Sequence, residues 1–81
     1  MDREQIYETM KKIFKEIFDD ESLEITDTTS ANDIEDWDSF EQINLLVAIE
    51  DNFGLEVSLK QANAMENVGQ MIDYIHERMS E

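Results

Sequence analysis

Large apolar residues recur at helical spacing in separate stretches of the chain. The first stretch predicts an amphipathic helix over about residues 3–18, because its apolar positions follow one another at intervals of three and four. These positions are Ile6, Met10, Ile13, Phe14, Ile17 and Phe18. A similar stripe predicts a helix that runs to the carboxyl end and consists of Val68, Met71, Ile72, Ile75 and Met79.

The stretch from residue 39 to residue 53 is apolar over a wider arc than a surface helix needs. At 100° per residue its large apolar side chains cover roughly 220°. They are Phe40, Ile43, Leu45, Leu46, Val47, Ile49 and Phe53. We therefore expect a helix from Ser39 to about Phe53 that is central or has a second apolar partner. Gly54 follows at once and favours a left-handed end to this helix.

Polar residues dominate the segment from residue 19 to residue 38. Its only large apolar residues are Leu23, Ile25, Ile34 and Trp37. Loops of this length without regular structure are uncommon in compact domains, so we expect these side chains to tie the segment to the helices.

Capping patterns mark the remaining helices. Ser58 with Gln61 forms a capping-box pattern that opens a short helix, and Asn67 with Gln70 repeats it before the last stripe. The chain has no proline. The prediction is an all-α fold with three longer helices, one short helix and a long loop between the first and second helices.

Length and composition limit the possible functions. A chain of 81 residues is expected to form one domain, residues 1–81, which is too small for two lobes around an enclosed cleft. Cysteine is absent, so disulfides, thiolate catalysis and zinc–thiolate sites are excluded. The amino terminus does not resemble a signal peptide, and no apolar run could span a bilayer. We therefore expect a cytoplasmic protein without membrane insertion.

Acidic residues give the chain a net charge of -15, and no lysine or arginine lies between Glu16 and Leu59. Such a field repels nucleic acid and anionic lipid and attracts basic protein surfaces in a salt-dependent way. Solubility alone would also explain many of these carboxylates. The concentration of acid around Ser39 favours a basic partner there.

Ser39 stands between an acidic loop and the apolar helix. A serine at this place is a helix cap, and Gln42 would complete a capping box. The same place leaves a hydroxyl at a helix amino terminus, where a phosphodiester is readily accommodated. Capping and modification are compatible.

Matches to a known motif surround this serine and consist of Asp38, Ser39, Phe40, Glu50 and Phe53. The segment resembles the attachment region of acyl carrier proteins, in which an Asp-Ser-Leu motif precedes a helix that ends near Glu-x-x-Phe. The resemblance implies a four-helix acyl-carrier-type bundle that is not an enzyme. It implies that a phosphopantetheinyl transferase moves 4'-phosphopantetheine from coenzyme A onto Ser39. The arm would then carry acyl intermediates as thioesters for fatty-acid, polyketide or related specialised biosynthesis.

The resemblance also implies partners and two sets of site residues. An acyl-loading enzyme and synthases would bring basic patches to a monomeric carrier. Their docking surface would be Asp38, Glu41, Val47, Glu50 and Asp51. The core or acyl cavity would be Ile43, Leu46, Ile49, Met65, Val68 and Ile72. Phe40 could join the docking surface, but we favour core packing for it.

Three departures from housekeeping fatty-acid carriers are Trp37, Asn44 and Ser58. They favour a carrier dedicated to a specialised pathway. A peptidyl or aryl carrier is the nearest alternative. A different class of function is an unmodified acidic helical adaptor or inhibitor that acts by surface charge.

Other chemistry has little support in the sequence. His76 lies far from Ser39 in sequence, and nothing near it resembles a catalytic triad. The acidic residues near Ser39 lack the glycine and the final glutamate of an EF-hand loop. We predict no metal site.

Overall fold

The computed structural model describes residues 2–80 and contains helices and loops but no strand within that range. The helices are α1 (Arg3–Ile17), the 3₁₀ turn η1 (Ala31–Asp33), α2 (Ser39–Phe53), α3 (Leu59–Ala64) and α4 (Val68–Met79). The predicted all-α fold, with three longer helices and one short helix, is confirmed. The turn η1 was not predicted.

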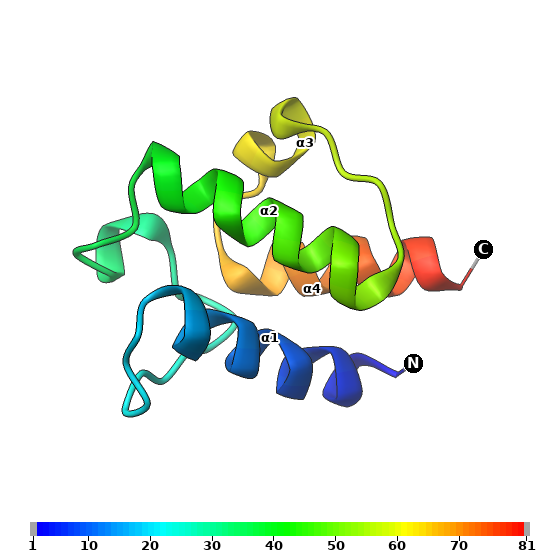
Figure 1. Ribbon diagram of the computed structural model, residues 1–81. Coiled ribbons are helices and arrows are strands. Elements are labelled where there is room, and N and C mark those ends of the chain that lie inside the picture. Colours follow the sequence, from blue (N-terminus) through cyan, green and yellow to red (C-terminus); the bar gives the residue numbers. More distant parts are fainter. Residues whose placement is uncertain (1, 81) are drawn as a thin grey trace.

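The three longer helices lie side by side, and α3 stands apart from α1 beyond α2 (Figure 1). Helix α1 packs against α2 and α4, and α3 packs against α2. Both chain ends lie at one end of the bundle, and the loop between α1 and α2 lies at the other end (Figure 1). Helix α2 therefore begins at the loop end.

The core lies between α1, α2 and α4. Its largest fully buried side chains are Phe14, Ile6, Met10, Ile25, Leu45, Ile72, Ile75 and Val68. Both predicted stripes face this core, although Ile17, Phe18 and Met79 at their ends are only partly buried. Burial of apolar surface is the main stabilising term in such a fold.

Apolar side chains tie the long loop to the bundle, as predicted. Ile25, Ile34 and Trp37 are buried, and Leu23 is half-buried. The indole of Trp37 meets the ring of Phe14 edge-on, with centroids 5.3 Å apart. Aromatic pairs favour this T-shaped arrangement. The loop therefore has a fixed path directly before α2.

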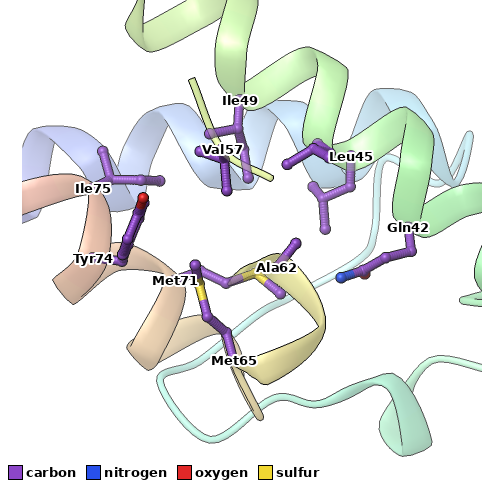
Figure 2. A pocket seen from close by; sticks show the side chains of 10 residues that line it. Gln42, Leu45, Ile49, Val57, Ala62, Met65, Met71, Tyr74 and Ile75 are labelled. Atoms are coloured by element: carbon purple, nitrogen blue, oxygen red, sulfur yellow. The ribbon is translucent and has the colours of Figure 1, made fainter. Parts of the chain in front are cut away.

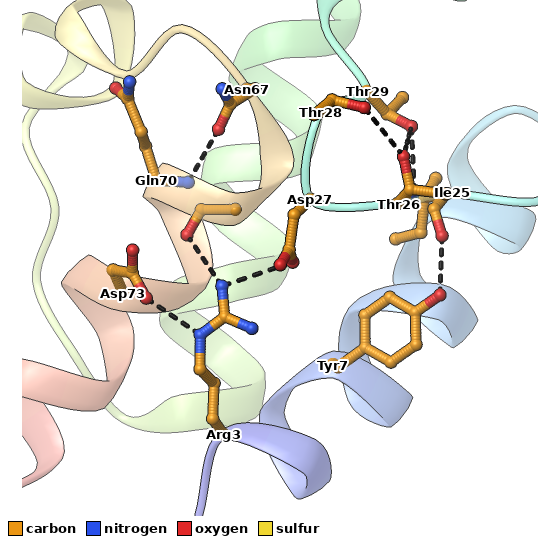
Figure 3. Close-up of polar contacts among 11 residues, drawn as sticks. Arg3, Tyr7, Ile25, Thr26, Asp27, Thr28, Thr29, Asn67, Gln70 and Asp73 are labelled. Carbon is orange, nitrogen blue, oxygen red and sulfur yellow. Dashed lines mark hydrogen bonds and ion pairs between the residues drawn. The ribbon is translucent and has the colours of Figure 1, made fainter.

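Polar contacts join the same loop to α1 and α4 (Figure 3). The backbone N–H groups of Val68 and Gly69 donate to the carbonyl oxygens of Thr29 and Asp27, each at 2.8 Å. These bonds satisfy two donors at the start of α4 that have no partner within the helix. A β-carbon on Gly69 would lie 2.7 Å from the Asp27 carbonyl oxygen. Only glycine permits this approach without a shift of the backbone.

Arg3 adds ionic contacts at this junction. Its Nε donates to Asp73 at 2.8 Å, and its Nη2 donates to Asp27 at 3.2 Å (Figure 3). The hydrogen bonds that Arg3 donates to Asp73, and then to Asp27, raise the pKa of Arg3. We call the set Arg3, Asp27, Thr29, Gly69 and Asp73 the polar clamp.

Helix α2 is only partly covered. Leu45, Ile49 and Phe53 are buried, whereas Phe40 is 73%, Ile43 48% and Val47 49% exposed. The expectation that Ile43 belongs to the core or cavity is wrong, and so is the expectation that Phe40 packs in the core. The apolar arc of α2 is wider than the surface that the other helices cover.

Candidate functional site

Asp38, rather than Ser39, caps helix α2. The Asp38 backbone is extended, and its carboxylate accepts a hydrogen bond from the Glu41 N–H at 2.9 Å. The predicted capping box of Ser39 and Gln42 is therefore wrong, because Ser39 is already the first helical residue. At the other end, Gly54 ends the helix with a left-handed backbone, φ 66°, as predicted.

Because Asp38 forms the cap, the Ser39 side chain takes no part in capping α2. Ser39 is exposed, and its hydroxyl has no hydrogen-bond partner among residues 2–80. The hydroxyl lies at a helix amino terminus, where N–H groups and the helix dipole favour an anionic group. Chemical modification at Ser39 would therefore break no hydrogen bond.

An open depression of about 320 Å³ lies beside Ser39. Its walls come from the turn η1, from the start of α2 and the two residues before it, from α3, from the segment that joins α3 to α4, and from Met71 of α4. They include Trp37, Asp38, Gln42, Asn63, Met65 and Glu66. The depression has both polar and apolar walls, so it can accommodate a chain with amide groups.

An apolar cavity adjoins this depression between α2, α3 and α4 (Figure 2). The residues that line both are Gln42, Ala62, Met65 and Met71. The remaining cavity walls are Leu45, Leu46, Ile49, Val57, Tyr74 and Ile75. The cavity has only about 10 Å³ of free space for a water-sized sphere, so its side chains nearly fill it.

Gln42 stands where the depression meets the cavity. The indole Nε1 of Trp37 donates to its Oε1 at 2.7 Å. Because the indole nitrogen can only donate, this bond fixes which end of the amide meets the tryptophan. The amide nitrogen of Gln42 is left as a donor on the side away from Trp37.

The predicted cavity residues fall into different places. Leu46, Ile49 and Met65 line the cavity. Val68 and Ile72 lie fully buried in the core but not on the cavity wall. Sequence reasoning missed several lining residues, which are Gln42, Leu45, Val57, Ala62, Met71, Tyr74 and Ile75. The helical stripes pointed to Leu45, Met71 and Ile75 as core, but no sequence signal marked Gln42 or Tyr74.

The predicted docking residues lie on α2 or directly before it, and they differ in exposure. Asp38, Val47 and Asp51 are exposed, whereas Glu41 and Glu50 are half-buried. The Glu50 carboxylate accepts from the Val57 N–H at 3.1 Å, so it also ties down the segment after α2.

Exposed apolar side chains run between these acids. Phe40, Ile43 and Val47 are spaced at three and four residues and so share one face of α2. We call these three residues the apolar stripe of α2. An exposed apolar stripe with acidic neighbours is typical of a protein interaction surface.

Comparison with known proteins assigns the chain to a family. A family model described as "Phosphopantetheine attachment site" matches residues 8–75. An acyl carrier protein of Coprothermobacter proteolyticus is 31% identical over 80 residues, which cover 98% of this chain and 96% of that protein. The chain belongs to the acyl carrier protein family.

Other acyl carrier proteins agree in sequence and in fold. One from Lactobacillus acidophilus is 28% identical over 75 residues and covers 93% of this chain and 94% of its own. The solution structure of a holo acyl carrier protein from Geobacter metallireducens has a TM-score of 0.84 and 34% identity. That match covers 91% of this chain and 85% of the other.

Family membership gives the general function. The protein is an acyl carrier and not an enzyme, and its prosthetic group is 4'-phosphopantetheine. Its partners include a phosphopantetheinyl transferase and enzymes that handle acyl groups. Each helix within residues 2–80 is too short or too polar to span a bilayer. These described residues also contain no group of three His, Cys, Asp or Glu side chains that could hold a metal ion.

Proposed function

We propose that Ser39 is the residue to which 4'-phosphopantetheine is attached. The observation that carries this proposal is the free, exposed hydroxyl at the first residue of α2, because Asp38 takes over the cap. A transferase needs a hydroxyl that it can reach without unfolding the helix. Ser39 also borders the depression, which in turn adjoins the apolar cavity.

The residues around Ser39 fit this group. The α2 amino terminus favours the phosphodiester, and the depression has polar and apolar walls along which an extended amide-containing arm can lie. When attached, the arm supplies a terminal thiol that holds acyl groups as thioesters. Ser39 itself is an attachment point, so no neighbouring base is needed in this chain.

We propose that partners dock on the uncovered face of α2. Asp38, Glu41, Glu50 and Asp51 offer negative charge, and the apolar stripe adds Val47 and its neighbours. Opposite charges speed encounter, and buried apolar side chains supply much of the affinity once water is excluded. Both terms act along α2 within about three helical turns of Ser39, so docking would bring a partner to the arm.

We propose that the carried groups are acyl intermediates of fatty-acid, polyketide or related specialised biosynthesis, and we favour a specialised pathway. The support is the pair Trp37 and Gln42. Trp37 replaces the small residue that housekeeping carriers usually have, and its indole positions the Gln42 amide at the cavity. A polar group at this place suits a cargo that is not plain hydrocarbon.

Three further statements remain predictions of the sequence. They are that one domain spans residues 1–81, that the protein is a monomer, and that it works in the cytoplasm. Gel filtration with light scattering would test the second, and localisation of the tagged chain would test the third.

The first experiment is attachment. We would incubate the protein with coenzyme A, magnesium and a promiscuous phosphopantetheinyl transferase, and compare intact masses of the wild type and Ser39→Ala. We expect a gain of one phosphopantetheine in the wild type and none in the variant. Because Asp38 supplies the cap, Ser39→Ala should stay folded, and circular dichroism would check this.

Ser58→Ala is the matched control. Ser58 also stands at a helix start and is exposed, but its hydroxyl oxygen accepts from the Gln61 N–H at 3.1 Å. We expect this variant to gain the group as the wild type does. A folded wild type that gains no mass would favour an unmodified acidic adaptor, and a Ser39→Ala variant that still gains mass would move the attachment site.

A further inference from the structure

The hydroxyl of Tyr74 is a buried polar group without a partner. Tyr74 lies on α4 and lines the apolar cavity, and its hydroxyl oxygen has no hydrogen bond among the described residues 2–80. Buried polar groups are nearly always hydrogen-bonded, and an unmade bond destabilises a protein. A phenylalanine would fill the same space without this penalty. The hydroxyl therefore calls for an explanation.

Water is a poor explanation for Tyr74. The cavity offers about 10 Å³, which is at the lower limit for one water molecule. A buried water also needs two to four polar partners. Apart from Gln42 and Tyr74 itself, the cavity is lined only by apolar side chains. Figure 2 shows these two polar side chains on α2 and α4, with Met71 and Ala62 between them.

We propose that the Tyr74 hydroxyl donates a hydrogen bond to an oxygen on the carried acyl chain. The cavity would then take a chain with a keto or hydroxyl oxygen beyond the thioester in preference to a saturated chain of the same length. This inference rests on the proposed function, because the chain must be attached through Ser39. It assigns Tyr74 as a specificity-determining residue for the cargo.

The polarity of the cavity supports this assignment. Gln42 presents its amide nitrogen at the end of the cavity next to the Ser39 depression, and Tyr74 presents its hydroxyl from α4. The walls between them are apolar. This arrangement matches a chain with a carbonyl near its attachment, a hydrocarbon middle and a further oxygen. A saturated chain would bury Tyr74 again without a partner, which is how a hydrogen-bonding site rejects an analogue.

The test uses thioester protection. Wild-type and Tyr74→Phe proteins would be loaded through Ser39 with a saturated chain and with matched chains that carry one keto group at successive carbons beyond the third. Loading is checked by intact mass. The rate at which 2-mercaptoethanol displaces each chain from the arm by thioester exchange, a reaction that leaves an isolated keto group intact, is then divided by the rate for the same chain on free pantetheine. This ratio removes the intrinsic reactivity of each thioester and reports only its burial in the protein.

In the wild type we expect at least one keto chain to be protected roughly tenfold better than the saturated chain. In Tyr74→Phe the ratio of protection between the keto chain and the saturated chain should fall to about one. Tyr7→Phe is the matched control, because the Tyr7 hydroxyl donates to the Ile25 carbonyl at 2.6 Å outside the cavity. Its removal should leave the discrimination between chains unchanged.

The outcomes separate the two proposals. If no chain is attached to folded wild-type protein, the proposed function fails and this inference fails with it. If all chains are attached but the wild type and Tyr74→Phe protect them in the same order and ratio, only this inference is overturned. If Tyr74→Phe changes the protection of every chain by the same factor, the hydroxyl affects packing or hydration rather than cargo choice, and the inference is overturned.

Discussion

The polar clamp fixes α4 firmly to the loop and to α1, whereas the short helix α3 is attached to α2 by far less. In the clamp, backbone hydrogen bonds at 2.8 Å and a glycine with no room for a side chain join the loop to α4, and the Arg3 side chain joins both to α1. Helix α3 has six residues, of which only Ala62 is buried, and its start is fixed by the capping box of Ser58 and Gln61. A helix of this length is not stable alone and depends on its contacts.

This difference places the adaptable part of the molecule next to Ser39. Met65 at the end of α3 and Ala62 within it line both the depression and the cavity, whereas no residue of the polar clamp does. Flexible thioether side chains adjust easily to a new neighbour. Since the cavity is nearly full, a bound chain needs more space, and the α3 wall can yield while the clamp keeps α1 and α4 in place. Elements of low local stability commonly serve such roles.

Two methionines give the sharpest contrast. Met10 is fully buried in the core between α1, α2 and α4, which we call the frame, whereas Met65 is half-buried at the cavity wall. We expect Met10→Ala to lower the free energy of unfolding by about 3 kcal/mol and Met65→Ala by about 1 kcal/mol. Urea denaturation monitored by Trp37 fluorescence measures both. Equal losses would mean that the α3 side is packed as tightly as the frame and is not the more adaptable part of the molecule.

Gly69 tests the clamp itself. A β-carbon there meets the Asp27 carbonyl oxygen, so Gly69→Ala must push the loop away from α4, and we expect a loss of about 2 kcal/mol. Gly54→Ala is the control, because its β-carbon would meet nothing within 4 Å and only its positive φ is strained. That variant should lose about 1 kcal/mol. A Gly69→Ala protein as stable as the wild type would show that the loop moves freely.

Periodicity predicted the helices well for a physical reason. Helical spacing and caps are local, so the stripes through Ile6 and Ile72, the turn at Gly54 and the box at Ser58 can be read from neighbouring residues. The cap of α2 failed because Asp38 and Ser39 are both capping residues, and adjacent candidates cannot be separated by pattern alone. The structure separates them by backbone geometry.

The missed features depend on which segments meet in space. The apolar arc of α2 does not reveal that Phe40 and Ile43 are exposed. Which of its side chains are covered depends on where α1 and α3 pack. The close approach at Gly69 and the buried hydroxyl of Tyr74 involve partners far away in sequence or none at all. These features arise from tertiary packing, and they are also the ones that bear on cargo and stability.

The serines at the starts of α2 and α3 differ, because only Ser58 caps its helix. Ser58→Ala removes the cap of the short helix, and we expect a loss of about 1 kcal/mol with faster amide hydrogen exchange confined to α3. Ser39→Ala removes no cap, so its stability should stay within about 0.5 kcal/mol of the wild type. Exchange that accelerates throughout the bundle in Ser58→Ala would mean that α3 belongs to the frame.

We expect the charges of the polar clamp to contribute little to stability. The Arg3 side chain is 41% exposed, and its partners Asp27 and Asp73 are 58% and 69% exposed, so solvent and salt screen these ion pairs. We expect Arg3→Gln to lose about 0.5 kcal/mol at low salt and less at high salt. Lys11→Gln is a comparable control, because the ion pair of Lys11 with Glu8 and its contact with the Tyr7 ring both lie within α1. A loss in Arg3→Gln as large as that in Gly69→Ala would mean that charge, rather than the backbone bonds to Val68 and Gly69, holds the loop against α4.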